Sequence, residues 1–133
     1  MDPSLPPGEI ARVAEFRAAL RAFMRKSERN ARQSGLTPQR YLLLLMIKGA
    51  PNGSERSTVT ELSERLQLAQ STVTELVRRA EETGLLKREP SASDGRVAYL
   101  QLTEEGNRRL MQAFTTNEEE RQELRAAIAH LED

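Results

Sequence analysis

The sequence predicts a mainly α-helical fold with one small β-hairpin. Long stretches repeat apolar residues every three or four positions, as helices do, whereas residues 85–102 change to a two-residue alternation around a turn-rich segment. The length of 133 residues suits one domain with a modest core. We expect residues 9–133 to form this domain. Residues 1–8, which hold three of the six prolines, are expected to form a flexible N-terminal arm.

The composition argues against several kinds of chemistry. The chain has no cysteine, which excludes disulfides, thiolate metal sites and a cysteine nucleophile. Its one histidine, His130, is expected to be an exposed surface residue, and no Gly-rich phosphate loop is present. We therefore expect no enzymatic activity, no metal and no cofactor. The longest apolar run, residues 41–47, is shorter than the roughly 20 residues that span a membrane, and no signal peptide is apparent, so a cytoplasmic location is expected.

The charges balance overall but are unevenly distributed along the chain. Twenty basic and twenty acidic side chains give a net charge of zero. Residues 1–54 carry nine basic against four acidic residues, residues 55–100 seven against eight, and residues 101–133 four against eight. A neutral chain can still bind a polyanion, because the local field matters more than the total charge. The balance is nevertheless unusual for nucleic-acid binding, which depends strongly on phosphate neutralisation.

Two helices are expected before residue 50. Residues 9–33 carry one apolar stripe and seven basic residues, and the basic face could be a solvated surface, a dimer contact or a DNA surface. The second helix should be capped by Thr37 and begin at Pro38, where a missing N–H costs nothing. Its run of residues 41–47 is apolar on all sides, which predicts a buried central helix.

Residues 58–84 have the pattern of a helix-turn-helix. Thr58 and Glu61 stand three residues apart, the spacing of a capping box, and open a short helix. A turn at residues 67–69 leads to a second helix of about residues 70–83, which Gly84 ends. Two short helices joined by a tight turn are typical of DNA-binding proteins, and the second helix is the candidate for entering the major groove.

A β-hairpin is expected directly after this helix. Residues 85–89 and 97–102 are predicted strands, and residues 91–95 have turn chemistry. A hairpin in this place is a wing, so the fold class is a winged helix-turn-helix, residues 36–102, between N- and C-terminal helices. Thr103 should cap the next helix. A break at residues 115–117 should precede a final amphipathic helix of residues 118–131.

The order of these elements resembles the MarR family of bacterial transcriptional regulators. The stretches that carry the resemblance are Gln70-Ser-Thr-Val-Thr74 with Leu76-Val77 and Arg79, then Gly84-Leu85, Asp94-x-Arg96 and Leu102-Thr-x-Glu-Gly106. The resemblance implies a homodimeric, repressor-type protein that binds a palindromic double-stranded DNA operator. Residues 9–35 and 103–133 would then be dimerisation helices. It also implies that a small aromatic effector could bind between these helices and the DNA-binding part.

The polar residues of the second helix and the wing are the candidate DNA contacts. Amide, hydroxyl and guanidinium groups at the start of a recognition helix can bond base edges or phosphates, and a wing-tip cation can enter a narrow minor groove. The same residue types are also ordinary on helix and turn surfaces. The candidates are Gln70, Ser71, Thr72, Thr74, Glu75, Arg78 and Arg96. By resemblance, Arg79 and Asp94 match a pair that braces the wing against the recognition helix.

Three features depart from the family pattern. Ala69 stands where a capping Ser or Thr is common, and the helix after the wing is short. Glu75 stands where a basic residue is common; its carboxylate could accept from a cytosine amino group or could repel phosphates. The alternative function is therefore a winged-helix module that binds protein and has weakened DNA affinity.

Overall fold

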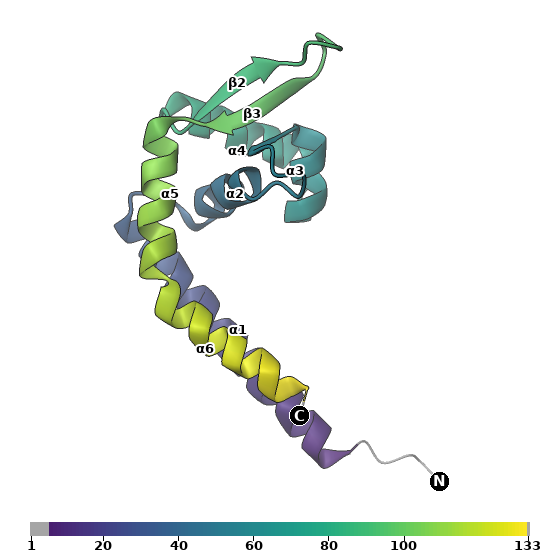
Figure 1. The fold of residues 1–133 in the computed structure, drawn as a ribbon, viewed down its shortest axis with the longest axis vertical. Coiled ribbons are helices and arrows are strands. Elements are labelled where there is room, and N and C mark those ends of the chain that lie inside the picture. Colours follow the sequence, from purple (N-terminus) through teal and green to yellow (C-terminus); the bar gives the residue numbers. More distant parts are fainter. Residues whose placement is uncertain (1–5, 133) are drawn as a thin grey trace.

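A computed structural model describes residues 6–132 and confirms the predicted fold class (Figure 1). Three short strands form one antiparallel sheet, and the rest of the regular structure is helical. The elements are α1 (Pro7–Gln33), α2 (Pro38–Lys48), β1 (Arg56–Ser57), α3 (Val59–Leu66), α4 (Gln70–Glu82), β2 (Leu86–Pro90), β3 (Ala98–Leu102), α5 (Glu104–Thr116) and α6 (Glu118–Leu131).

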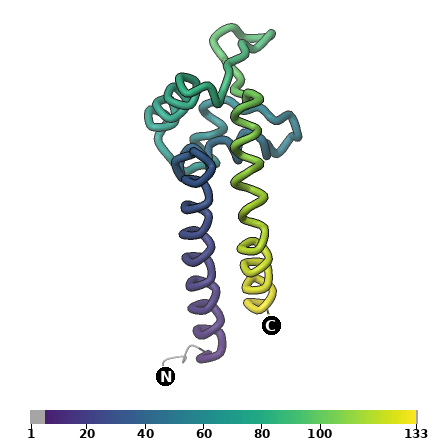
Figure 2. Tube along the Cα trace, turned by 90° about the vertical axis from the view of Figure 1, so that its left-hand side faces the viewer, coloured from purple at the N-terminus to yellow at the C-terminus, as the bar shows by residue number. Residues whose placement is uncertain are grey.

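The molecule consists of a winged-helix body and a two-helix rod. The body holds α2, α3, α4 and the sheet, while α1 and α6 pack side by side and extend away from it (Figures 1 and 2). Helix α5 connects the wing to the rod. The start of α1 and the end of α6 therefore lie far from the wing (Figure 2).

The flexible arm expected for residues 1–8 needs a correction. Residues 1–5 lie outside the described part of the chain, but Pro7 and Gly8 belong to α1. Proline is well tolerated in the first turn of a helix, because its missing N–H would have no partner there in any case. The three prolines therefore do not keep the helix from starting before residue 9.

Side-chain caps fix the starts of three helices, as predicted. The Thr37 hydroxyl accepts from the Arg40 N–H at 3.1 Å, and the Thr103 hydroxyl accepts from the Gly106 N–H at 3.0 Å. At the start of α3, both halves of the capping box between Thr58 and Glu61 are present. These local bonds satisfy N–H groups that the helices themselves leave unpaired.

Helix α2 lies at the centre of the core. Leu43, Leu44 and Ile47 are fully buried, as the apolar run predicted, but Leu42 is 41% exposed, so the helix is not covered on every side. Around it pack apolar side chains from α3, α4, the sheet region and α5. These include Leu62, Val73, Val77, Leu85, Leu100 and Leu110.

The sheet has one strand more than the predicted hairpin. β2 and β3 pair antiparallel, with Leu86 opposite Leu102, and β1 pairs with the other edge of β3, giving the order β1-β3-β2. Residues 52–56 are polar residues and one glycine, so they show no strand pattern of their own. The two-residue β1 is set by its pairing with β3 rather than by any local alternation.

A buried polar cluster ties the rod to the body where α5 ends. Asn117 is 1% exposed, and its side-chain oxygen accepts from the Asn30 amide at 2.5 Å. The Asn117 amide in turn lies 3.4 Å from the hydroxyls of Ser27 and Tyr41. The predicted break between the last two helices is therefore also a junction that joins α1, α2 and α5.

The rod leaves apolar side chains uncovered. α6 has no fully buried residue and α1 has only Ala31. The large exposed apolar side chains of α1, α5 and α6 are Ile10, Val13, Met24, Met111 and Ile128. His130, at the end of α6, is exposed as expected and lies 3.2 Å from Glu15 of α1. No helix within residues 6–132 combines the length and apolar character needed to cross a bilayer.

Candidate nucleic-acid interface

The turn between α3 and α4 sets the direction of the candidate recognition helix. Gln67 adopts a left-handed conformation with φ of 56°, which turns the chain sharply after α3. The Ser63 hydroxyl donates to the Leu68 carbonyl at 2.5 Å and holds the turn closed. Helix α4 then buries Val73, Val77 and Ala80 against the core. Its opposite face is left to solvent.

The first turns of α4 present polar groups to solvent, as the sequence predicted. Ser71, Thr72 and Thr74 are exposed, and the Gln70 amide lies 3.5 Å from the Thr60 hydroxyl. Ala69 provides no side-chain cap. The first N–H groups of α4 therefore have no capping side chain, so they can donate to an external acceptor.

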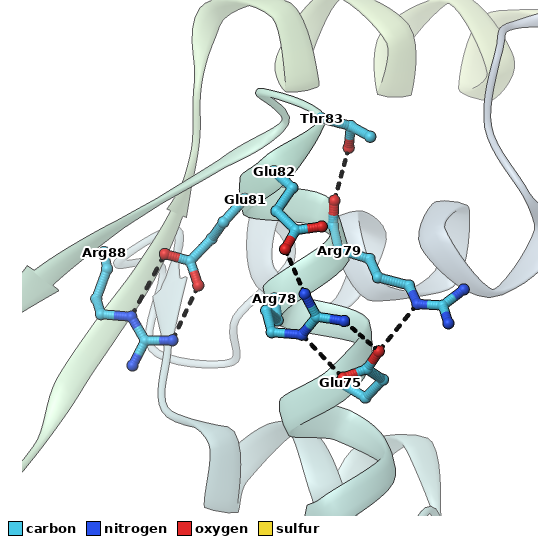
Figure 3. A network of polar contacts seen from close by, with 7 residues as sticks. All are labelled: Glu75, Arg78, Arg79, Glu81, Glu82, Thr83 and Arg88. Atoms are coloured by element: carbon cyan, nitrogen blue, oxygen red, sulfur yellow. Dashed lines mark hydrogen bonds and ion pairs between the residues drawn. The ribbon is translucent and has the colours of Figure 1, made fainter.

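A charged cluster of four residues occupies the same helix one turn further on (Figure 3). We call it the Glu75 cluster; its members are Glu75, Arg78, Arg79 and Glu82. The Glu75 carboxylate accepts from Arg78 at 2.6 and 3.0 Å and from Arg79 Nε at 3.0 Å, and Arg78 also donates to Glu82. The hydrogen bonds from Arg78 and Arg79 lower the pKa of Glu75 to about 2, and the bond to Glu75 raises the pKa of Arg78. Both arginines are thus engaged by carboxylates of their own helix.

The wing is joined to α4 by a pair that the sequence did not indicate. Arg79 and Asp94 do not meet in this structure, because Arg79 bonds Glu75 and Asp94 bonds Arg96. Instead, Glu81 of α4 forms a two-point ion pair with Arg88 of β2 (Figure 3). The ion pair that joins recognition helix and wing is therefore formed by residues other than the expected Arg79 and Asp94, and these are brought together only in the tertiary fold.

The wing tip places its cation in solvent. Asp94 accepts from the backbone N–H of Arg96 at 3.0 Å and from its Nε at 3.3 Å. The Arg96 side chain is nevertheless 91% exposed. It therefore projects from the tip of the hairpin, where a narrow groove of DNA could receive it.

A close backbone contact anchors the base of the wing on α5. The Thr103 hydroxyl donates to the Gly84 carbonyl at 2.6 Å, and the Thr103 N–H donates to the Leu85 carbonyl at 3.0 Å. A Cβ atom on Gly106 would lie 2.1 Å from that same Leu85 oxygen. Only glycine allows α5 to approach the α4–β2 connection this closely.

A groove of about 400 Å³ runs along the exposed side of α4. It brings Gln39, from the first turn of α2, beside residues of α4 that are 30 or more positions away in the sequence. Its lining residues are Gln39, Ser71, Thr72, Glu75, Leu76 and Arg79. Gln39 and the Glu81–Arg88 pair could not be found from sequence spacing. The Glu75 cluster could have been, because its members are three or four positions apart.

Comparisons with known proteins agree with this geometry. The family model described as the MarR family matches residues 34–97. The chain is 30% identical over 99 residues to MdtR, an HTH-type transcriptional repressor of Bacillus subtilis, and the match covers 71% of this chain. It covers 61% of MdtR, so the chain spans less than two thirds of that relative.

Two solved structures have the same fold. AbsC, a MarR family transcriptional regulator from Streptomyces coelicolor, superposes with a TM-score of 0.70 at 20% identity, over 97% of this chain and 84% of AbsC. A mutant MarR from E. coli, complexed with operator DNA, gives 0.68 at 21% identity, over 81% of this chain and 75% of that one. The chain is thus similar to the MarR family in sequence, where the family model matches residues 34–97, and it shares the fold of MarR family regulators.

Proposed function

We propose that this chain is a sequence-specific transcriptional regulator of repressor type that binds double-stranded DNA as a homodimer. The observation that carries the proposal is the exposed polar face of α4, which begins at Gln70 and is held beside a wing with a projecting Arg96. A helix of this kind fits the major groove, and a hairpin beside it reaches the flanking minor groove.

The first turn of α4 supplies two kinds of contact. Ser71, Thr72 and Thr74 carry hydroxyls that can bond base edges or phosphates, and Gln70 carries an amide that matches adenine. The uncapped N–H groups after Ala69 can donate to a phosphate oxygen at the positive end of the helix dipole. Contacts with the bases and contacts with the DNA phosphates would thus come from the same turn of α4.

The relatives support the same function. The E. coli MarR mutant was solved with operator DNA, and MdtR is named as a repressor. This chain has both a recognition-helix candidate, α4, and a β2–β3 hairpin.

The uncovered apolar side chains of the rod support a homodimer. A two-helix rod with Val13 and Ile128 in solvent would lower its free energy by pairing with a second copy. Ile128→Glu should convert the dimer to a monomer with unchanged helix content. Ala126→Glu, about 200° away around the same exposed helix, should leave the dimer intact. Light scattering after size exclusion distinguishes the two, and a dimer that survives Ile128→Glu would contradict this interface.

A small apolar cavity between α1 and α2 is the candidate site for a small aromatic effector. It measures about 90 Å³ and is lined by Phe23, Met24, Ser27, Glu28, Pro38, Tyr41 and Leu42. Ser27 and Tyr41 also belong to the Asn117 cluster that joins rod and body. A ligand here would therefore touch the junction between the dimerisation and DNA-binding parts.

Two observations favour the alternative, a winged-helix module that binds protein. Arg78 and Arg79 are neutralised by carboxylates, and residues 55–100 carry a net charge of −1. Sequencing of genomic fragments retained by the purified protein separates the two functions. A regulator should enrich a palindromic motif with two half-sites about one helical turn apart. Retention without any shared motif would contradict sequence-specific binding.

A further inference from the structure

The recognition helix carries its own counter-ions. All three nitrogens of the Arg78 guanidinium face carboxylates: Nε and Nη2 face Glu75, and Nη1 faces Glu82. Arg79 Nε is bonded to the same Glu75. Helix α4 holds these two basic residues against three acidic ones, so its cations are balanced before any DNA approaches.

Glu75 also lies where DNA would be contacted. It lines the groove along α4 together with Ser71, Thr72 and Arg79. Figure 3 shows its carboxylate placed between the guanidinium groups of Arg78 and Arg79. A phosphate or guanine that takes Arg78 must therefore first remove it from Glu75, whereas Arg79 is held to Glu75 through Nε alone.

We propose that Glu75 is a specificity-determining residue, which holds Arg78 and Arg79 in the free protein and releases them at DNA sites that offer a base amino group in their place. The inference rests on the proposed DNA-binding function. Glu75 would have this role through the Glu75 cluster, which consists of Glu75, Arg78, Arg79 and Glu82.

The physical reason is that the Glu75 carboxylate loses its hydrogen-bond partners when the arginines move to DNA. Exposed ion pairs are individually weak, so a polyanion can draw the arginines away. Glu75 would then be an unpaired anion in a groove lined by phosphates, which is unfavourable. The amino group of cytosine in the major groove can donate to a carboxylate and replace the lost partner. Sites without such a donor are thus disfavoured, which is specificity by exclusion.

The test compares Glu75→Gln with Glu64→Gln in the full chain. Both remove one negative charge from the helix-turn-helix, but Glu75 is half-buried and paired, whereas the Glu64 side chain is exposed and makes no ion pair within residues 6–132. Glu75→Gln should tighten binding to a random-sequence duplex by roughly tenfold at low salt. It should also steepen the slope of log affinity against log salt by about two, one for each freed arginine. Glu64→Gln should leave the slope unchanged.

Base preference gives the second measurement. On the retained operator, the wild type should prefer cytosine at one position per half-site, and Glu75→Gln should lose that preference alone. Equal slopes for Glu75→Gln and Glu64→Gln, or an unchanged preference, would overturn the inference while leaving DNA binding in place. Failure of the wild type to bind any duplex would overturn the proposed function as well.

A measurement on the free protein tests whether the Glu75 cluster forms, independently of any DNA binding. Titration of the Glu75 carboxyl by NMR should give a pKa of about 2 in the wild type and a higher pKa in Arg78→Gln. An ordinary pKa for Glu75 in the wild type would show that the cluster does not form, and would overturn the inference without any duplex.

Discussion

Glu81 of α4 and Arg88 of β2 form an ion pair with two contacts: Arg88 Nη2 lies 2.9 Å from Glu81 Oε1, and Arg88 Nε lies 3.4 Å from Oε2. The bond to Glu81 raises the pKa of Arg88. Two parallel contacts fix the relative orientation of two groups better than one. The pair therefore links the direction of the wing to that of the recognition helix.

Glu81→Gln tests this link, because the two explanations predict opposite changes in DNA affinity. Removing a negative charge near DNA should by itself tighten binding. If the pair positions the wing, binding should instead weaken, while the free energy of unfolding changes by less than about 1 kcal/mol. Fluorescence anisotropy with the operator and thermal unfolding give the two values. Tighter binding, like that expected for a simple charge removal, would show that the pair does not position the wing.

Arg96→Ala should weaken DNA binding without changing the dimer. The Arg96 side chain is almost fully exposed, so its loss should leave the fold intact and remove one cationic contact. The salt slope should become shallower by about one. Equal affinities for Arg96→Ala and the wild type would remove the wing tip from the interface.

Gly106→Ala should destabilise the protein although alanine favours helices. In an ordinary helix interior the change stabilises by about 1 kcal/mol. Here the new Cβ would meet the Leu85 carbonyl oxygen at 2.1 Å, so α5 must shift, at a cost of about 2 kcal/mol or more. Gly95→Ala, whose Cβ would meet nothing within 4 Å, is the matched control. Urea unfolding of both variants measures the difference, and equal stabilities would contradict the close contact.

The protein should lose stability in acid through Glu75 and Glu105. Hydrogen bonds from Arg108 and Arg109 lower the pKa of Glu105 to about 2, as those from Arg78 and Arg79 do for Glu75. A carboxyl whose pKa is lower in the folded state stabilises above the ordinary value of about 4.5. That contribution disappears as the pH falls towards 2.

Urea unfolding at several pH values checks this expectation. The free energy of unfolding should decrease between pH 4.5 and 2, and Glu105→Gln should make that decrease shallower. Glu64→Gln removes an exposed carboxylate that forms no ion pair with the described residues, 6–132, and serves as the comparison. The same pH profile for wild type and Glu105→Gln would rule out the contribution of Glu105.

Local signals explain why most helices could be predicted from the sequence. Thr37, Thr58 and Thr103 each cap the helix that follows, and Gly84, with φ of +76°, ends α4. These bonds join residues at most three positions apart, so the residue types at that spacing suffice to predict them. The same holds for the break before Glu118.

Tertiary pairing explains what the sequence could not predict. β1 is two residues long and exists through β3, whereas the wing brace needs Glu81 and Arg88 from different elements. The expected partner of Arg79 was Asp94, but Glu75 lies one turn away on the same helix and takes its place. That local pair, unlike the Glu81–Arg88 pair, was within reach of sequence spacing.

The dependence of duplex binding on salt tests the central claim most directly, that α4 and the wing form a DNA-binding surface. Fluorescence anisotropy of the wild-type protein with its retained operator, from low to physiological salt, gives both affinity and slope. We expect tight binding that weakens steeply as salt rises, with a shallower slope for Arg96→Ala. Absence of binding to any duplex at low salt would contradict it.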